Sequence, residues 1–351
     1  MTTLPPANIP DSTPVSSERT APRWQLELSQ AIRSGSELLR RLQLTADQFP
    51  DLLPDSATID FPVLVPHSFL NRMQPGDPRD PLLLQVLPQD SEISSAPGFS
   101  ADAVGDLQAR RSPGLLHKYH GRVLLMAAGA CAVHCRYCFR RQYPYAEEPR
   151  RLEDWEPAMA EIEGNSEVHE VILSGGDPLV LNDNRLTQLC QRIARIPHID
   201  RIRFHTRLPI VLPSRVTPEL CSLLTTLPQQ VLLVVHANHA SEIRDDCLAA
   251  LRQLVQAGLP VLNQAVLLKN INNSLEAQEQ LSLSLVNAGV LPYYLHQLDR
   301  VDGTQHFEVS EDIGQQIVTA LQARLPGYAV PRYVRETPGA SGKTPLLREF
   351  P

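Results

Sequence analysis

Three cysteines on one short stretch carry the clearest chemical signal in this sequence. Cys131, Cys135 and Cys138 have the spacing Cys-x3-Cys-x2-Cys. Thiolates on one tight loop can hold three irons of a four-iron cluster, which leaves the fourth iron open to a small chelating molecule. A structural zinc site is an alternative, but it normally needs a fourth ligand, and His134 is poorly placed to supply one. Three unrelated buried thiols are the other alternative. Tyr137, the aromatic residue before the last cysteine, favours the iron–sulfur interpretation.

A lysine near the C-terminus follows a glycine-rich stretch. Lys343 comes directly after Pro-Gly-Ala-Ser-Gly, which indicates a backbone that passes close to a flat or anionic group. A desolvated amine at such a place can become nucleophilic toward an aldehyde. A phosphate-binding P-loop would need glycine where Thr337 stands and a helix where Pro345 stands. A solvated surface lysine is the remaining alternative.

A second glycine-rich segment, Ser174-Gly175-Gly176-Asp177, follows an apolar run. The glycine pair lets the backbone approach a ligand closely, and the carboxylate can accept a hydrogen bond from an ammonium. Alone, these residues are only a turn signal. Their place after a predicted strand, close behind the cysteine loop, favours a binding role.

After residue 120 short apolar runs alternate with amphipathic segments. Repeated βα units with right-handed crossovers predict an α/β fold whose parallel sheet curls into a full or partial (β/α)6 TIM-like barrel. A doubly wound sheet is the alternative. The predicted strands are 122–127, 170–173, 201–205, 231–236, 260–268 and 292–297, and the predicted helices are 154–162, 185–196, 217–227, 245–257 and 275–287.

Polar or reactive residues follow nearly every predicted strand. In such barrels chemistry occurs at the C-terminal ends of the strands, so these residues should meet at one end of the barrel. They are Cys131 to Cys138, Ser174 to Asp177, Thr206 and Arg207, Asn238 and His239, Lys269 and Asn270, and Asp299.

The N-terminal third is crowded with proline and predicts a different organisation. Residues 1–22 contain five prolines and few large apolar side chains, which predicts a flexible tail. Residues 23–115 predict a wrap with one or two amphipathic helices, followed by extended chain with short helical turns. Residues 116–330 then form the barrel core, and residues 331–351 form a C-terminal segment that carries Lys343.

Length and composition exclude several classes of protein. With 351 residues the chain can bury a large core, and its net charge of −7 disfavours binding to nucleic acid. No apolar run approaches the ~20 residues of a membrane helix, and no signal peptide is recognisable, so we expect a cytoplasmic protein. The other three cysteines are Cys190, Cys221 and Cys247. They lie in segments with a helical pattern, and we expect them to be buried thiols.

These motifs together resemble the radical S-adenosylmethionine enzymes, and in particular the lysine 2,3-aminomutase family. The resemblance extends from about residue 61 to residue 343. It is strongest to the short branch that supplies β-lysine for modification of translation elongation factor P. The matching strings are His117-Lys118-Tyr119, Arg122-Val123-Leu124-Leu125, Cys138-Phe139-Arg140-Arg141, Ser174-Gly175-Gly176-Asp177-Pro178-Leu179, Pro292-Tyr293-Tyr294 and Pro338 to Pro345.

The resemblance implies the radical SAM fold, an isomerase activity and three cofactors. Cys131, Cys135 and Cys138 would hold the 4Fe-4S cluster. S-adenosyl-L-methionine would chelate the open iron, with its methionyl amine on the Ser174 to Asp177 segment. Lys343 would bind pyridoxal 5'-phosphate covalently. The implied reaction converts L-lysine to β-lysine by 1,2-amino migration, started by a 5′-deoxyadenosyl radical.

The resemblance also assigns the substrate and cofactor contacts. Arg140 matches the family's carboxylate-binding arginine, and Asp299 matches an aspartate that binds the ε-ammonium of lysine. Glu336 stands where the family has a second such aspartate, a departure that alters the depth of the pocket. Lys118 stands where longer family members have an arginine that binds the cofactor phosphate. Its ammonium offers a point charge but not the two parallel hydrogen bonds of a guanidinium. Tyr119 and Arg122 match the family and would contact the cofactor ring and phosphate, with a solvated cation at the strand end as the alternative for Arg122. Their places at predicted strand ends, and not the resemblance, make His205, Arg207, His236 and His239 candidates for the adenosyl site, with a buried, hydrogen-bonded histidine as the alternative for each of the three histidines.

Partners follow from the same resemblance. We expect L-lysine as the substrate, an electron donor protein, and a functional link to elongation factor P and its ligase. The chain ends eight residues after Lys343, without the extension that longer members use for zinc and subunit contacts, so a homodimer is expected rather than a tetramer. Alternatives are the same chemistry on protein-attached lysine or on another amino acid, and a non-catalytic iron–sulfur module.

Overall fold

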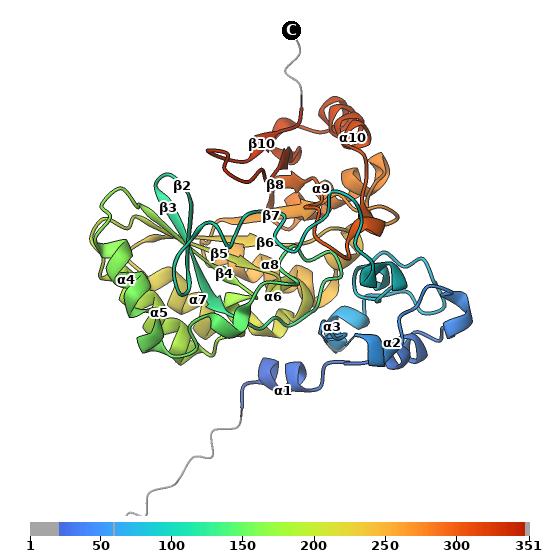
Figure 1. Cartoon of the computed structure of the whole chain (residues 1–351), viewed down its shortest axis with the longest axis horizontal. Helices are drawn as coiled ribbons and strands as arrows, with labels where there is room; N and C mark the ends of the chain where they lie inside the picture. The colour runs from blue at the N-terminus through green and yellow to red at the C-terminus, as the bar shows by residue number, and fades with distance from the viewer. Residues whose placement is uncertain (1–20, 59, 348–351) are drawn as a thin grey trace, which may run out of the picture.

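The computed structural model describes residues 21–58 and 60–347 (Figure 1). The flexible tail predicted for residues 1–22 therefore lies almost wholly outside the described residues. Within the described chain, no helix is long and apolar enough to cross a membrane.

One ten-stranded sheet forms the centre of the fold, and its strands follow one another in chain order. Strands β3 to β9 are parallel, while β1, β2 and β3 pair antiparallel at one edge and β9 and β10 pair antiparallel at the other. The six predicted strands correspond to β3 to β8. The strands are β1 (Arg110–Ser112), β2 (Leu115–Tyr119), β3 (Arg122–Ala128), β4 (Glu170–Gly175), β5 (Arg201–Thr206), β6 (Gln230–Val235), β7 (Val261–Val266), β8 (Leu291–His296), β9 (Arg332–Arg335) and β10 (Thr344–Pro345).

The order of the strands decides between the two predicted architectures. A doubly wound sheet reverses its strand order at a switch point, whereas here each strand pairs with the next one in the chain. The doubly wound alternative is therefore wrong. In the described chain β1 and β10 each have a single neighbour, so the barrel is open, and the predicted partial (β/α)6 barrel is confirmed.

Helices follow the parallel strands, and the five predicted ones are present. Three of them begin at a side-chain cap: Asn182, Thr217 and Ser274 accept hydrogen bonds from backbone amides three residues later. Figure 1 shows α4, α5 and α7 together on the outer side of the sheet. The helices of this part are α4 (Glu156–Glu163), α5 (Asp183–Ala194), α6 (Leu208–Val211), α7 (Pro218–Thr226), α8 (Asp245–Gln256), α9 (Leu275–Asn287) and α10 (Glu311–Arg324).

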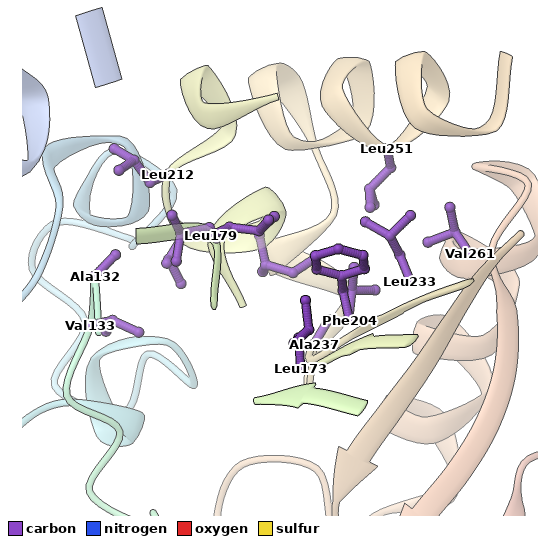
Figure 2. Packing of buried hydrophobic residues seen from close by; sticks show 14 of the residues in the cluster. Ala132, Val133, Leu173, Leu179, Phe204, Leu212, Leu233, Ala237, Leu251 and Val261 are labelled. Atoms are coloured by element: carbon purple, nitrogen blue, oxygen red, sulfur yellow. The ribbon is translucent and has the colours of Figure 1, made fainter. Parts of the chain in front are cut away.

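A continuous apolar layer lies between the sheet and its helices (Figure 2). It contains Phe204 of β5, Leu233 of β6 and Leu251 of α8, all fully buried. Because successive side chains of a strand point to opposite faces, burying Phe204 against the helices turns Arg203 and His205 to the other face. The packing of the core thus determines which side chains of β5 line the interior of the barrel.

The N-terminal wrap shares this hydrophobic core. Trp24, Leu38, Val65 and Phe69 are buried in the same cluster as the strands of the barrel. One or two amphipathic helices, followed by extended chain with short helical turns, were predicted for this part of the chain. The wrap contains α1 (Arg23–Ser29), α2 (Gly35–Arg41) and α3 (His67–Leu70), with short 3-10 turns between α2 and α3 and after α3.

Candidate active site

A cavity of about 420 Å³ runs through the interior of the barrel and reaches the C-terminal ends of the parallel strands. Except for His239, every residue that the sequence assigned to metal, cofactor or substrate lies on its wall, including His205, Arg207 and His236. The others are Lys118, Tyr119, Arg122, Cys131, Cys135, Cys138, Arg140, Ser174, Gly175, Gly176, Asp177, Asp299, Glu336 and Lys343. The fold therefore joins segments from β2 to β10 around one space.

The cysteine loop follows β3, and its three cysteines are free thiols. Burial, with Cys135 nearby, raises the pKa of the Cys138 thiol to about 11, and burial likewise raises the pKa of Cys131. Thiols with such pKa values stay protonated near neutral pH unless a bound cation displaces the proton. A metal cluster would supply that charge, so this donor set fits the group.

The cysteines do not form a ready site for a single ion. Within residues 21–58 and 60–347, no group of three or more His, Cys, Asp or Glu side chains could hold one metal ion. The ligands of a four-iron cluster bind separate irons and need no such convergence.

The glycine pair after β4 packs against the chain that leads into the cysteine loop. A Cβ on Gly176 would lie 2.2 Å from the carbonyl oxygen of Ala130, and one on Gly175 would lie 2.5 Å from that of Ala128. Gly175 also has a φ of +113°. The close approach that the sequence predicted is therefore an approach to the protein's own backbone, which holds the two loops together.

Asp177 differs from the expectation that its carboxylate receives the ammonium of a ligand. One oxygen accepts hydrogen bonds from the Leu179 amide and the Thr206 hydroxyl, and the other accepts them from the amides of Arg207 and Leu208. Burial nevertheless raises its pKa to about 6. Because four donors already occupy the carboxylate, its role is to join the β4 and β5 loops, and the backbone of residues 174–176 is left to contact a ligand.

A buried carboxylate that the sequence did not single out, Asp106, pairs with two of the predicted anion-binding cations. Its Oδ2 lies 2.6 Å from Nε of Arg140, and its Oδ1 lies 2.6 Å from Nζ of Lys118. Burial acts to raise the pKa of Asp106, but the two cations hold it below its usual range. Arg140 also donates to the Ser174 hydroxyl at 3.1 Å. Asp106 lies in the irregular wrap, where no motif marks it.

Lys343 lies on the loop before β10 and pairs with Glu336. Its Nζ is 2.7 Å from Oε2 of Glu336, while Oε1 accepts a hydrogen bond from the Tyr119 hydroxyl. Burial acts to raise the pKa of Glu336, but Lys343 and these hydrogen bonds hold it below its usual range. Arg122 stacks near Tyr119, with its guanidinium carbon 4.7 Å from the ring centroid.

Asp299, which follows β8, is a further acidic group of the cavity. Burial raises its pKa to about 7, against the opposing effect of Lys343. In the described part of the chain, no Lys, Arg or His nitrogen lies within ion-pair distance of its carboxylate. Of the two acidic residues predicted to bind the ε-ammonium of lysine, Asp299 is thus the one that a ligand can reach without breaking an ion pair.

Neutral histidines line the interior of the barrel between these groups. Burial lowers the pKa of His236 to about 3, and it also lowers those of His205 and His296. His236 is 2.7 Å from Gln264, whereas Nε2 of His205 and Nε2 of His296 have no hydrogen-bond partner in the described chain. Buried polar atoms normally have partners, so these two nitrogens suit a bound molecule. His239 lies outside the cavity wall and accepts a hydrogen bond from the Ser241 amide.

Comparison with known proteins defines the class first. Residues 127–277, from the end of β3 through the start of α9, match the radical SAM superfamily. This region contains the cysteine loop, the glycine pair and two interior histidines, His205 of β5 and His236, which directly follows β6.

Relatives that cover nearly the whole chain narrow the class. The L-lysine 2,3-aminomutase of Escherichia coli (strain K12) is 45% identical over 92% of this chain and 94% of its own length. The L-lysine 2,3-aminomutase of Haemophilus influenzae is 42% identical over 93% of this chain and 96% of its own length. The enzyme of Clostridium subterminale is 32% identical over 93% of this chain and 78% of its own length. The chain belongs to the L-lysine 2,3-aminomutase family. It is thus an isomerase of a family whose cofactors are a 4Fe-4S cluster, S-adenosyl-L-methionine and pyridoxal phosphate.

Proposed function

We propose that this protein converts L-lysine to β-lysine by 1,2-amino migration, with all three cofactors in one cavity. The observation that carries the proposal is that the three cysteines and Lys343 line the same 420 Å³ space. When bound, the cluster with S-adenosyl-L-methionine supplies a radical that can take hydrogen from an unactivated carbon, and pyridoxal phosphate supplies a π-system across which nitrogen can migrate.

The cysteine side of the cavity would hold the cluster and the sulfonium cofactor. Cys131, Cys135 and Cys138 are the proposed iron ligands, and the backbone of residues 174–176 is the proposed contact for the methionyl group. Tyr145 donates to the carbonyl of Gly175 at 2.8 Å and so fixes that backbone. The unpartnered nitrogen of His205 is available to the adenosyl part.

The opposite side would hold pyridoxal phosphate. Lys343 is the proposed attachment point, with Lys118 and Arg122 as phosphate contacts and Tyr119 as a ring contact. All four line the cavity. Since Glu336 now pairs with Lys343, an incoming cofactor must replace that ion pair.

The substrate would lie between these two sides. Arg140 would bind its carboxylate through Nη2, because Asp106 accepts from Nε and the Ser174 hydroxyl accepts from Nη1. Asp299 would bind the ε-ammonium, and we assign Glu336 a secondary part because it already pairs with Lys343. Apolar residues on the wall, among them Val104, Leu116 and Leu298, would limit the access of water to the reacting carbon.

The wider setting is also part of the proposal. We place the product in the supply of β-lysine for elongation factor P and its ligase, with an electron donor protein as the reductant and a homodimer as the assembly. A cytoplasmic location agrees with the six free cysteines, which are usual in a reducing compartment.

The test is anaerobic reconstitution followed by quantification of iron, sulfide and pyridoxal phosphate. Cys135→Ala should lose iron and sulfide but keep the pyridoxal phosphate, whereas Lys343→Ala should lose only the covalent cofactor. Cys190→Ala is the matched control, because Cys190 is a buried thiol of α5 away from the cavity. Full covalent labelling of Lys343→Ala would contradict the assignment of this lysine.

Activity then separates the substrates. The reconstituted protein is assayed with free L-lysine, with L-glutamate and with intact elongation factor P, and we expect a β-amino acid only from free lysine. Product on the intact factor alone would favour the protein-attached substrate. The absence of product from all three, in wild-type protein that holds a full cluster but shows no visible absorption band of a pyridoxal imine, would favour a non-catalytic iron–sulfur module.

A further inference from the structure

A buried arginine from a different strand contacts one of the three cysteines. Arg207 follows β5, 72 positions along the chain from Cys135, and its Nη1 donates to Cys135 Sγ. Its Nη2 donates to Gln85 Oε1 at 2.6 Å and to Glu242 Oε2 at 3.0 Å. Arg207 is 7% exposed and Glu242 is fully buried.

Glu242 is itself fixed by the chain around it. Its Oε1 accepts hydrogen bonds from the amides of Asn238 and His239 at 2.8 and 3.0 Å, and from Gln85 Nε2 at 3.2 Å. These bonds leave Oε2 aimed at Arg207. The guanidinium is thus held in one orientation, with Nη2 on the Glu242 carboxylate and Nη1 on the Cys135 sulfur.

Stability alone is a weak reason for this arrangement. Burying an ion pair costs solvation energy that the pair rarely recovers, so apolar residues of the same volume would often be as stable. The orientation of the charge toward a sulfur points instead to an electrostatic effect on whatever that sulfur binds.

The physical consequence concerns the charge of an iron–sulfur cluster. Reduction adds one negative charge, and a hydrogen bond from a cation to a ligating sulfur stabilises the more negative state. We propose that Arg207 is a positioning residue that donates a hydrogen bond to the cluster-ligating sulfur of Cys135, raises the reduction potential of the cluster, and is held in place by Glu242. This inference rests on the proposed cluster at the three cysteines.

The test compares midpoint potentials in variants that hold a full cluster. Arg207→Met removes the charge at similar length, and Arg207→Lys keeps the charge without the fork. Arg201→Met is the matched control, because Arg201 opens the same strand, is 44% exposed and lies about 20 Å from Arg207 along β5. The readout is anaerobic redox titration followed by electron paramagnetic resonance, with iron and sulfide counted in each sample.

At a fixed solution potential we expect the ratio of reduced to oxidised cluster to fall about tenfold in Arg207→Met, which is 59 mV for a one-electron couple. The ratio of reduced to oxidised cluster should fall less in Arg207→Lys, and in Arg201→Met it should equal that of wild type. If Arg207→Met assembles no cluster, Arg207→Gln, which is neutral but can still bond Glu242, serves for the same comparison.

A neutral variant with full iron content and an unchanged ratio would overturn the inference. So would an equal fall in Arg201→Met, since the effect would then not depend on contact with Cys135. Failure of the wild-type chain to bind any cluster would instead contradict the proposed function, so the two failures are distinguishable.

Discussion

The Nζ of Lys343 lies 2.7 Å from Oε2 of Glu336, and the same carboxylate accepts a hydrogen bond from Tyr119, 217 positions earlier in the chain. One side chain therefore ties the C-terminal loop to β2. The sequence suggested that Glu336 binds the ammonium of a substrate, but in the structure it binds the ammonium of the protein's own lysine.

Glu336→Gln should loosen the loop that carries Lys343. Replacing a partly buried, charge-assisted contact by a neutral one should lower the local free energy of opening by about 1–2 kcal/mol. Amide hydrogen exchange in residues 336–345 should then be about 5- to 30-fold faster. The control is Glu311→Gln, which breaks the more exposed ion pair with Arg335 and should change exchange little. Equal effects in both variants would contradict the prediction.

The buried carboxyl of Asp299 predicts a pH dependence. Burial raises its pKa to about 7, so the ionised form that can bind an ammonium dominates only above that pH. The kcat/KM for L-lysine, which reports on the free enzyme, should therefore rise with pH through about 7 and then level off. Asp299→Asn should remove this step and raise KM about 10- to 100-fold. A step that persists near pH 7 in this variant would assign the titration to another group.

Gly176→Ala should disturb the cysteine loop without touching a cysteine. The new Cβ would lie 2.2 Å from the carbonyl oxygen of Ala130. Because neither a Cβ nor a backbone carbonyl can move aside by a side-chain rotation, the strain should cost about 3 kcal/mol. We expect a lower melting temperature and less iron after reconstitution. Gly327→Ala is the control, because a Cβ there meets no atom within 4 Å. A Gly176→Ala protein with normal stability and iron content would contradict the packing argument.

Asp106→Asn should leave the buried Arg140 without a counter-charge and should remove the nearer of the two carboxylates beside Lys118, which keeps Glu336 at 3.7 Å. Lys118 and Arg140 both pair with this carboxylate, so the variant should be about 3 kcal/mol less stable in thermal unfolding without cofactors. Inorganic phosphate should restore more stability to the variant than to wild type, because an added anion can replace the lost one. Asp200→Asn, at an exposed position, should behave as wild type. Equal responses to phosphate in Asp106→Asn and wild type would contradict this reading.

Much of the fold could be predicted from local patterns. The strands β3 to β8 and the helices between them follow from apolar periods of two and 3.6 residues, which each segment carries by itself. The helix α10 was missed although Ile317, Val318 and Leu321 provide the same signal on one face. The strand β9 is four residues long, and only Tyr333 and Val334 in it are buried. It is too short to show the alternation of apolar and polar residues by which a strand is recognised in a sequence.

The sequence by itself determined which reactive residues this protein has and at which end of the barrel they lie, because a cysteine spacing and a strand end are local properties. Only the tertiary structure decided how they pair. Asp106 meets Arg140 and Lys118, and Arg207 meets Cys135, across 12 to 72 positions of chain. Such pairing depends on burial and on which loops the folded sheet brings together, and no short stretch of sequence contains that information.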